Sequence, residues 1–151
     1  MPRIEVSTTI AAPPEEVWAA VEDVGTHVEW MADAEAIRFD TDQTSGTGTS
    51  FECDTKIGPF ELTDHMTITE WVPGEVMGVR HTGLVTGEGR FTLTPAAGGG
   101  TEFAWREELR FPWWMGGAVG GAAGAPVMKR VWRGNLRRLK AKVEGSSSAS
   151  S

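Results

Sequence analysis

Short breaks between strand-like segments are the feature of this 151-residue sequence that most restricts its fold. From Glu35 onward, runs with apolar residues at every second position alternate with short breaks rich in Gly and Pro, which predicts strands joined by tight turns. The predicted strands cover residues 36–41, 48–57, 60–71, 75–82, 88–95 and 101–111. Breaks of hairpin length leave no room for crossover helices, so we expect consecutive strands to pair antiparallel in one meander.

A strand and two short helices are predicted before this meander. Residues 3–10 are rich in β-branched side chains and favour a strand. Pro13-Pro14 favours the start of a helix, because proline is tolerated in the first helical turn. We expect Gly25 to end this helix and Thr26 to cap a second short helix that runs to Met31.

A long amphipathic helix is predicted at the C-terminal end. Apolar residues recur at helical spacing from Val127 or Met128 to Val143, with basic residues on the opposite face. The glycine-rich segment 116–126 is either a mobile gate or the first part of this helix. Residues 111–128 carry no charge, but their Gly, Ala and Pro content makes them a poor membrane span. The Ser-rich residues 145–151 are expected to be a disordered tail.

The order strand, two short helices, six strands and long helix is that of the helix-grip fold. The sequence resembles the START-like (SRPBCC) superfamily, which includes Bet v 1 relatives, lipid-transfer START domains and bacterial proteins similar to polyketide cyclases and dehydrases. The residues that carry the resemblance are IAAPPEEVW at 10–18, Trp30, TEWVP at 69–73 and WRGNL at 132–136. The resemblance implies an α+β helix-grip fold (β-α-α-β6-α) in one domain over residues 1–144. A curved seven-stranded antiparallel sheet would wrap around the C-terminal helix and enclose a cavity. This superfamily includes carriers, receptors, cyclases and co-chaperones, so the fold alone does not name an activity.

Charge and cysteine content exclude several classes of function. A net charge of −7 disfavours nucleic acid as a partner, because phosphates are bound by basic faces. One cysteine excludes an internal disulfide framework and suits a reducing cytosol, and the first residues lack a secretion signal. Histidine and cysteine show no metal-ligand spacing, so we expect neither a metal nor a cofactor. The expectation is a cytoplasmic monomer or homodimer that binds a hydrophobic small molecule.

Side-chain alternation indicates which residues face the concave side of the sheet. The apolar residues select one parity in each strand, and the turns align the strands. A turn at Pro73-Gly74 is expected to pair Val72 with Glu75. The alignment predicts five further cross-strand pairs: Cys53 with Asp64, Met66 with His81, Val79 with Phe91, His81 with Gly89, and Gly89 with Glu107.

Polar side chains at inward positions are the candidates for chemistry. Asp64, His81 and Glu107 are predicted to face the cavity near one end of the sheet, and Gly89 leaves space between His81 and Glu107. Buried carboxylates need partners, and a histidine between two of them is pushed toward its charged form. The three residues therefore form either an acid–base site or a wet rim where polar side chains are expected.

A larger group of residues is predicted to line the cavity, although core packing would explain the same residues. The predicted ligand-binding residues are Trp30, Phe51, Cys53, Met66, Met77, Val79, Phe91, Trp105, Trp113, Met115, Met128, Trp132 and Asn135. Asn135 interrupts the apolar stripe of the last helix, and we favour a hydrogen bond to a backbone group over contact with a ligand. Cys53 is expected to be an unreactive core residue, and His27 and His65 are expected to be exposed.

Two functional hypotheses follow. The first is a binding protein for an aromatic or polyketide-like molecule. If it is an enzyme, it catalyses cyclisation or dehydration by cofactor-free proton transfer through His81, assisted by Asp64 or Glu107. The alternative is a non-catalytic carrier or sensor for a lipid or other hydrophobic ligand, with Trp113 and Trp114 in contact with a membrane. A partner-binding module with a filled interior is a third class.

Overall fold

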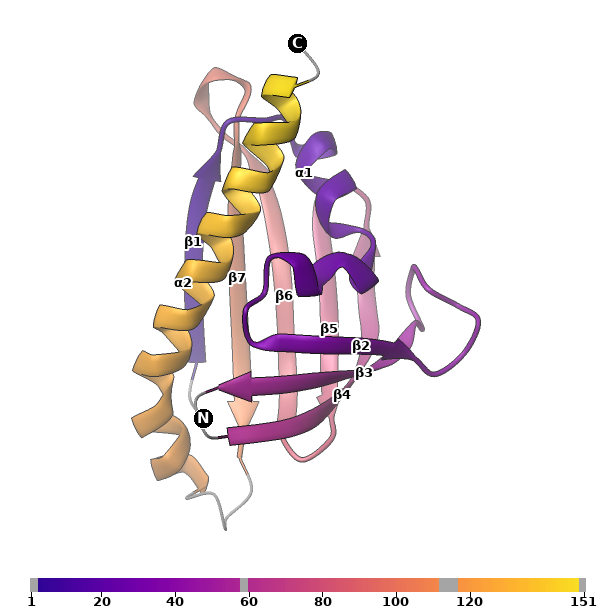
Figure 1. Ribbon diagram of the computed structural model, residues 1–151, viewed down its shortest axis with the longest axis vertical. Coiled ribbons are helices and arrows are strands. Elements are labelled where there is room, and N and C mark those ends of the chain that lie inside the picture. The colour runs from indigo at the N-terminus through magenta and orange to yellow at the C-terminus, as the bar shows by residue number, and fades with distance from the viewer. Residues whose placement is uncertain (1–2, 58–59, 112–116, 150–151) are drawn as a thin grey trace.

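A strongly curved antiparallel sheet, closed on its concave side by one long helix, forms the protein (Figure 1). The computed structural model describes residues 3–57, 60–111 and 117–149. The strands lie in the order β1-β7-β6-β5-β4-β3-β2, and all neighbouring pairs are antiparallel. Their bounds are β1 Arg3–Ile10, β2 Ala34–Phe39, β3 Ser50–Ile57, β4 Phe60–Val72, β5 Val76–Thr82, β6 Thr86–Pro95 and β7 Thr101–Arg110. This arrangement confirms the predicted helix-grip fold.

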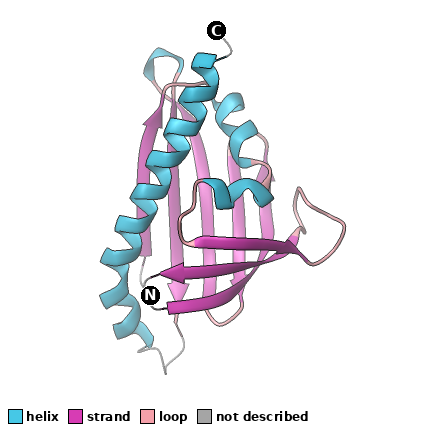
Figure 2. Ribbon diagram, in the orientation of Figure 1, coloured by secondary structure: helices cyan, strands magenta, loops and turns pink. Residues whose placement is uncertain are grey.

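The sheet bends so far that its two ends face each other. Figure 2 shows β2, β3 and β4 crossing in front of the strands at the other end of the sheet, while the long helix α2 (Gly117–Ala149) runs beside β1. The helix α1 (Pro14–Val21) and the 3₁₀ helix η1 (Val24–Glu29) close the remaining side, and a short 3₁₀ turn η2 (Ala97–Gly99) joins β6 to β7. The space between the sheet and α2 is therefore bounded by almost every element of the fold.

Three predicted pairs are confirmed: Cys53 lies opposite Asp64, Met66 opposite His81, and Gly89 opposite Glu107. The β5–β6 register was predicted wrongly. The loop between these strands contains residues 83–85 instead of 84–86, so His81 pairs with Gly87, and Val79 pairs with Gly89. A shift of two residues keeps every side chain on its predicted face, because the period of a strand is two.

The β4–β5 hairpin differs from the predicted pairing near its turn, but a bulge in β4 restores the predicted register. Val72 pairs with Val76 and not with Glu75, so the turn is one residue longer than expected. A bulge between Ile68 and Glu70 absorbs the extra residue. Beyond the bulge the pairs return to the predicted register.

The two N-terminal helices begin and end differently from the prediction. Helix α1 ends at Val21, four residues before Gly25. The second helix is a 3₁₀ helix whose cap is Asp23, since Asp23 Oδ1 accepts a hydrogen bond from the Gly25 amide at 3.1 Å. Thr26 does not cap it, because its hydroxyl donates to the carbonyl oxygen of Asp23 at 2.7 Å.

Helix α2 is longer than the amphipathic pattern predicts. It begins at Gly117, so the glycine-rich residues 117–126 belong to the helix, with Pro126 inside it. It continues to Ala149, through most of the segment predicted to be a disordered tail. Within the described residues, no helix is long and apolar enough to cross a membrane.

Packing differs along α2. Near its C-terminal end, Leu136, Leu139 and Val143 are buried against the sheet and close the hydrophobic core. Burial of one such side chain contributes roughly 1.5–3 kcal/mol. Nearer the start of the helix, Met128 and Trp132 line an internal cavity.

Candidate functional site

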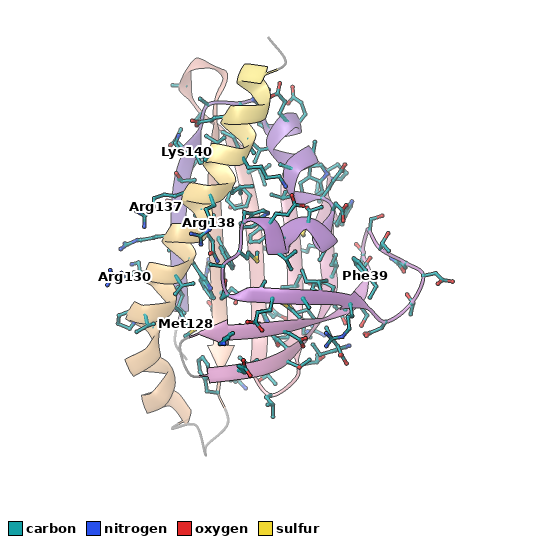
Figure 3. All side chains as sticks on the ribbon, viewed as in Figure 1. Phe39, Met128, Arg130, Arg137, Arg138 and Lys140 are labelled. Atoms are coloured by element: carbon teal, nitrogen blue, oxygen red, sulfur yellow. The ribbon has the colours of Figure 1, made fainter. Side chains whose placement is uncertain are left out.

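A cavity of about 560 Å³ lies between the concave face of the sheet and the first half of α2. Side chains from η1, α2 and strands β2 to β7 line it. Met128 lies on the sheet side of α2, whereas Arg130 and Arg137 project from the opposite side (Figure 3). Nine of the predicted ligand-binding residues line the cavity: Phe51, Cys53, Met66, Met77, Val79, Phe91, Trp105, Met128 and Trp132.

One wall of the cavity is a rigid aromatic surface. The rings of Trp105 and Trp132 stack with centroids 4.5 Å apart and planes inclined by 13°. Phe91 meets Trp105 edge-on at 5.3 Å. Met66 and Met77, which are flexible, line other parts of the wall. Such a surface suits flat, apolar molecules.

The structure places Trp30 and Asn135 behind the wall rather than on it, which corrects the prediction for these two residues. Trp30 packs against His27, Phe91 and Trp105, with ring centroids 5.2–6.2 Å away. Its indole Nε1 is buried without a partner among the residues that the structure describes. The other two predictions, Trp113 and Met115, lie outside the described residues.

Asn135 connects α2 to the chain that follows η1. Its Oδ1 accepts a hydrogen bond from the Ala32 amide at 2.9 Å, and its Nδ2 donates to Asp33 Oδ1 at 2.7 Å. Trp132 Nε1 donates to the second oxygen of Asp33 at 3.3 Å. Asn135 therefore makes the backbone hydrogen bond that we favoured from the sequence.

The inward polar residues Asp64, His81 and Glu107 form one hydrogen-bonded cluster on the cavity wall. His81 Nδ1 donates to Asp64 Oδ2 at 2.7 Å, and His81 Nε2 donates to Glu107 Oε1 at 3.2 Å. The exposed fractions are 9% for Asp64, 5% for His81 and 7% for Glu107. Gly89 makes room for the cluster, because a Cβ atom there would lie 2.5 Å from Glu107 Oε1.

The partners of His81 decide its charge. Burial lowers the pKa of His81, but the charge of Glu107 and the hydrogen bonds to Asp64 and Glu107 outweigh burial and raise the pKa to about 10. With both carboxyl groups ionised, the cluster holds one positive and two negative charges. Both N–H groups of the imidazolium are used by the two carboxylates, so neither is left to meet a ligand directly.

The free oxygens of the two carboxylates have different surroundings. Asp64 Oδ1 is fully enclosed and has no hydrogen-bond partner in the described part of the chain. Glu107 Oε2 also makes no hydrogen bond to a described residue, but it is not among the enclosed atoms. Since Glu107 lines the cavity, Oε2 is the oxygen of the cluster that a ligand can reach.

His27 was predicted to be exposed, and this prediction is wrong: the residue is buried and lines the cavity. Its Nε2 donates to the carbonyl oxygen of Val21 at 2.7 Å. Burial lowers the pKa of His27 to about 4, although this hydrogen bond opposes the change. The sequence prediction began the second helix only after Thr26, whereas η1 begins at Val24, so it did not place His27 on one face with Val24. At the three-residue spacing of a 3₁₀ helix, Val24 and His27 lie on the same buried face.

Other predictions near the site concern Cys53 and His65. Burial raises the pKa of the Cys53 thiol to about 11, as expected for an unreactive cysteine. His65 faces outward, as its parity predicted, but it is half-buried and bonds Asp40. Lining residues missing from the predicted set include Met31, Asp33, Ile37, Leu62, Val85 and Leu109. Leu62 and Leu109 share the inward parity, which could have identified them.

Comparison with known proteins gives the family. The model of a family described as "Polyketide cyclase / dehydrase and lipid transport" matches residues 1–144. The chain belongs to this family. No curated protein sequence matches the chain significantly.

Several solved structures have a similar fold. TTHA0849 from Thermus thermophilus has a TM-score of 0.80 and 18% identity, with 97% of this chain and 99% of that chain covered. The Zhui aromatase/cyclase from Streptomyces sp. R1128 has a TM-score of 0.74 and 16% identity, with 95% and 93% covered. The di-domain ARO/CYC StfQ from the steffimycin biosynthetic pathway has a TM-score of 0.78 and 16% identity. The match covers 97% of this chain and 51% of StfQ. At these identities the likeness shows the shared fold.

The cavity and the charged cluster on its wall together limit the chemistry that this site can carry out. An aromatic and methionine-lined chamber can hold an apolar molecule, and a buried charged cluster can exchange a proton with it. Among the described residues, no group of His, Cys, Asp and Glu is placed to hold a metal ion.

Proposed function

We propose that this chain binds an aromatic or polyketide-like hydrophobic molecule in the internal cavity, and that the Asp64–His81–Glu107 cluster transfers protons to and from it. The observation that carries the proposal is a charged cluster buried on the wall of a largely apolar cavity. Buried ion pairs add little net stability compared with apolar packing, so a need for stability does not explain the cluster well. Titratable groups with perturbed pKa values in a cavity are typical of functional sites.

The geometry favours Glu107 as the group that meets the ligand. In a dehydration, Glu107 Oε2 would accept a proton from a carbon next to a carbonyl group. The electrons of that C–H bond would form the new C=C bond as a hydroxyl group leaves. Glu107 would then return the proton to the leaving hydroxyl, which departs as water. His81 is a positioning residue in this scheme, since its positive charge and its hydrogen bond hold Glu107 in place.

Binding is tested with N-phenyl-1-naphthylamine, a neutral dye that fluoresces in apolar surroundings. We expect saturable binding of one dye per chain. Val79→Phe places a larger side chain on the cavity wall and should weaken binding by about tenfold or more, while Val72→Phe changes an exposed residue and should leave it unchanged. A wild-type chain that shows no saturable binding would remove the proposal.

Proton transfer is tested with 2-tetralone, a ketone with exchangeable hydrogens, in D₂O. We expect the chain to accelerate deuterium uptake over buffer, and we expect Glu107→Gln to reduce this acceleration by roughly 10²-fold or more. Glu108→Gln is the matched control, because Glu108 is the next residue in β7 and lies on the outer face beside Arg3 and Arg106. Equal acceleration by wild type and Glu107→Gln would exclude Glu107 as the base.

A non-catalytic lipid carrier is the second candidate, favoured by apolar residues at the cavity that are open to solvent. Leu84 and Val127 both line the cavity and are 51% and 54% exposed. Arg130 and Arg137 project from the outer side of α2 (Figure 3). Co-sedimentation with anionic phosphatidylserine vesicles tests this candidate: binding that Leu84→Ser or Val127→Ser weakens supports a carrier. A chain that stays in solution with such vesicles is not a carrier of this kind.

A further inference from the structure

We infer that the cavity selects neutral apolar ligands that carry a hydroxyl group as a hydrogen-bond donor, such as phenols and enols, and rejects ligands that carry a carboxylate. This inference rests on the proposed binding function. It follows from which polar atoms of the wall are already used by the protein and which are left for a ligand.

At the charged cluster, the atom left for a ligand is an acceptor. His81 has given both N–H groups to Asp64 and Glu107. Asp64 Oδ1 is enclosed, whereas Glu107 Oε2 is free of described partners and is not enclosed. A carboxylate oxygen accepts hydrogen bonds and cannot donate one. A ligand hydroxyl that reaches Glu107 therefore has to point its hydrogen at Oε2.

His27 offers a second acceptor on the same cavity. Its Nε2 carries the hydrogen, because the partner of Nε2 is a carbonyl oxygen, which can only accept. A neutral imidazole with the hydrogen on Nε2 has a lone pair on Nδ1. Nδ1 makes no hydrogen bond to any described residue and is not among the enclosed polar atoms.

Donors on the wall are mostly occupied. Trp132 Nε1 donates to Asp33, and Thr55 Oγ1 donates to Cys53 Sγ. The Nη2 group of Arg90 donates to Glu70, and the Arg90 side chain is about half exposed. The indole N–H of Trp105 has no hydrogen-bond partner among the described residues, and it is the neutral donor that remains for a ligand oxygen.

The charged groups on the cavity wall also favour a neutral ligand over a carboxylate. Four carboxyl groups, those of Asp33, Glu61, Asp64 and Glu107, line the cavity, against two positive groups, the guanidinium of Arg90 and the imidazolium of His81. A carboxylate brought into this chamber would lose its hydration and meet a net negative surrounding, which disfavours its binding. A neutral hydroxyl group meets no such repulsion.

Three matched naphthalenes test this inference by displacement of N-phenyl-1-naphthylamine from the wild-type chain. 1-Naphthol has a hydroxyl donor, 1-methoxynaphthalene has the same oxygen without the hydrogen, and 1-naphthoate has a carboxylate. We expect naphthol to bind about tenfold or more tightly than methoxynaphthalene, as for a hydrogen bond to a charged acceptor, and naphthoate to bind most weakly.

The variant Glu107→Gln tests whether the Glu107 carboxylate causes the preference for naphthol over methoxynaphthalene. It should reduce the naphthol preference to about threefold or less and should strengthen naphthoate binding, whereas Glu108→Gln should change neither. Equal affinities of naphthol and methoxynaphthalene, or naphthoate binding as tight as naphthol binding, would overturn the inference while the cavity-binding proposal stands. If the chain binds neither the dye nor any of the naphthalenes, both the inference and the cavity-binding proposal are wrong.

Discussion

His27 and His81 lie on the wall of the same cavity and both are 5% exposed, but their pKa values are shifted in opposite directions. The pKa of His27 falls to about 4, and the pKa of His81 rises to about 10. Burial disfavours the charged form of both rings. The difference comes from their partners, because His27 bonds a neutral carbonyl group and His81 bonds two carboxylates. For a buried histidine, the chemistry of the partner decides the charge more than the depth of burial does.

Removal of His81 should have the largest effect on this pair of sites. His81→Leu leaves Asp64 and Glu107 buried together without a counter-charge, and we expect it to lower the free energy of unfolding by about 3–5 kcal/mol at pH 7. The matched variant His27→Leu loses one hydrogen bond to a carbonyl group and should cost about 1–3 kcal/mol. Urea unfolding of both variants measures the difference. Equal costs would show that the two histidines do not differ in charge.

Acid should affect the His27 site next. Its folded-state pKa lies below the value of an unfolded chain, 6.5, so its contribution to stability is present above pH 6.5 and is lost as the pH falls toward 4. A shift of this size corresponds to roughly 3 kcal/mol. His27→Gln cannot titrate, and its amide nitrogen can still donate to Val21, so its stability should fall less between pH 6.5 and pH 4. Parallel curves for wild type and His27→Gln would contradict the low pKa.

Gly89→Ala should have a smaller effect that is confined to the His81 site. The new Cβ would approach Glu107 Oε1 to 2.5 Å and Glu107 Cγ to 2.7 Å, so the Glu107 side chain must move away from His81. We expect a loss of about 1–3 kcal/mol. In a Glu107→Ala background the same substitution should cost little, which a double-mutant cycle by urea unfolding would measure. Additive costs would show that Gly89 does not serve to accommodate Glu107.

Strand parity made most of the charged cluster predictable. Asp64, His81 and Glu107 are polar residues at positions where the apolar neighbours face inward, so their placement on the concave face follows from a period of two. The predicted β5–β6 loop made Gly89 the partner of His81, whereas the observed loop makes it a diagonal neighbour on the same face. Alternation predicts the face of a residue but not the contacts that its side chain makes. It therefore could not predict which oxygen of Glu107 stays free.

The regions without a simple period were less predictable. The 3₁₀ geometry of η1 places His27 on the cavity wall, and a short helix of this kind has no pattern distinct from an α-helix in six residues. The connection between Asn135 and Asp33 joins residues 102 positions apart. Such a contact depends on how α2 is placed over the sheet, which local sequence patterns do not determine.

The unequal packing along α2 separates two structural roles on one helix. Leu136, Leu139 and Val143 hold the helix to the sheet, while Met128 and Trp132, nearer the start of the helix, face the chamber. Substitutions at the chamber end can change the shape of the ligand site without removing the contacts that keep the helix in place. The ligand preference of this chain can therefore be altered at one end of α2 while the other end keeps the framework intact.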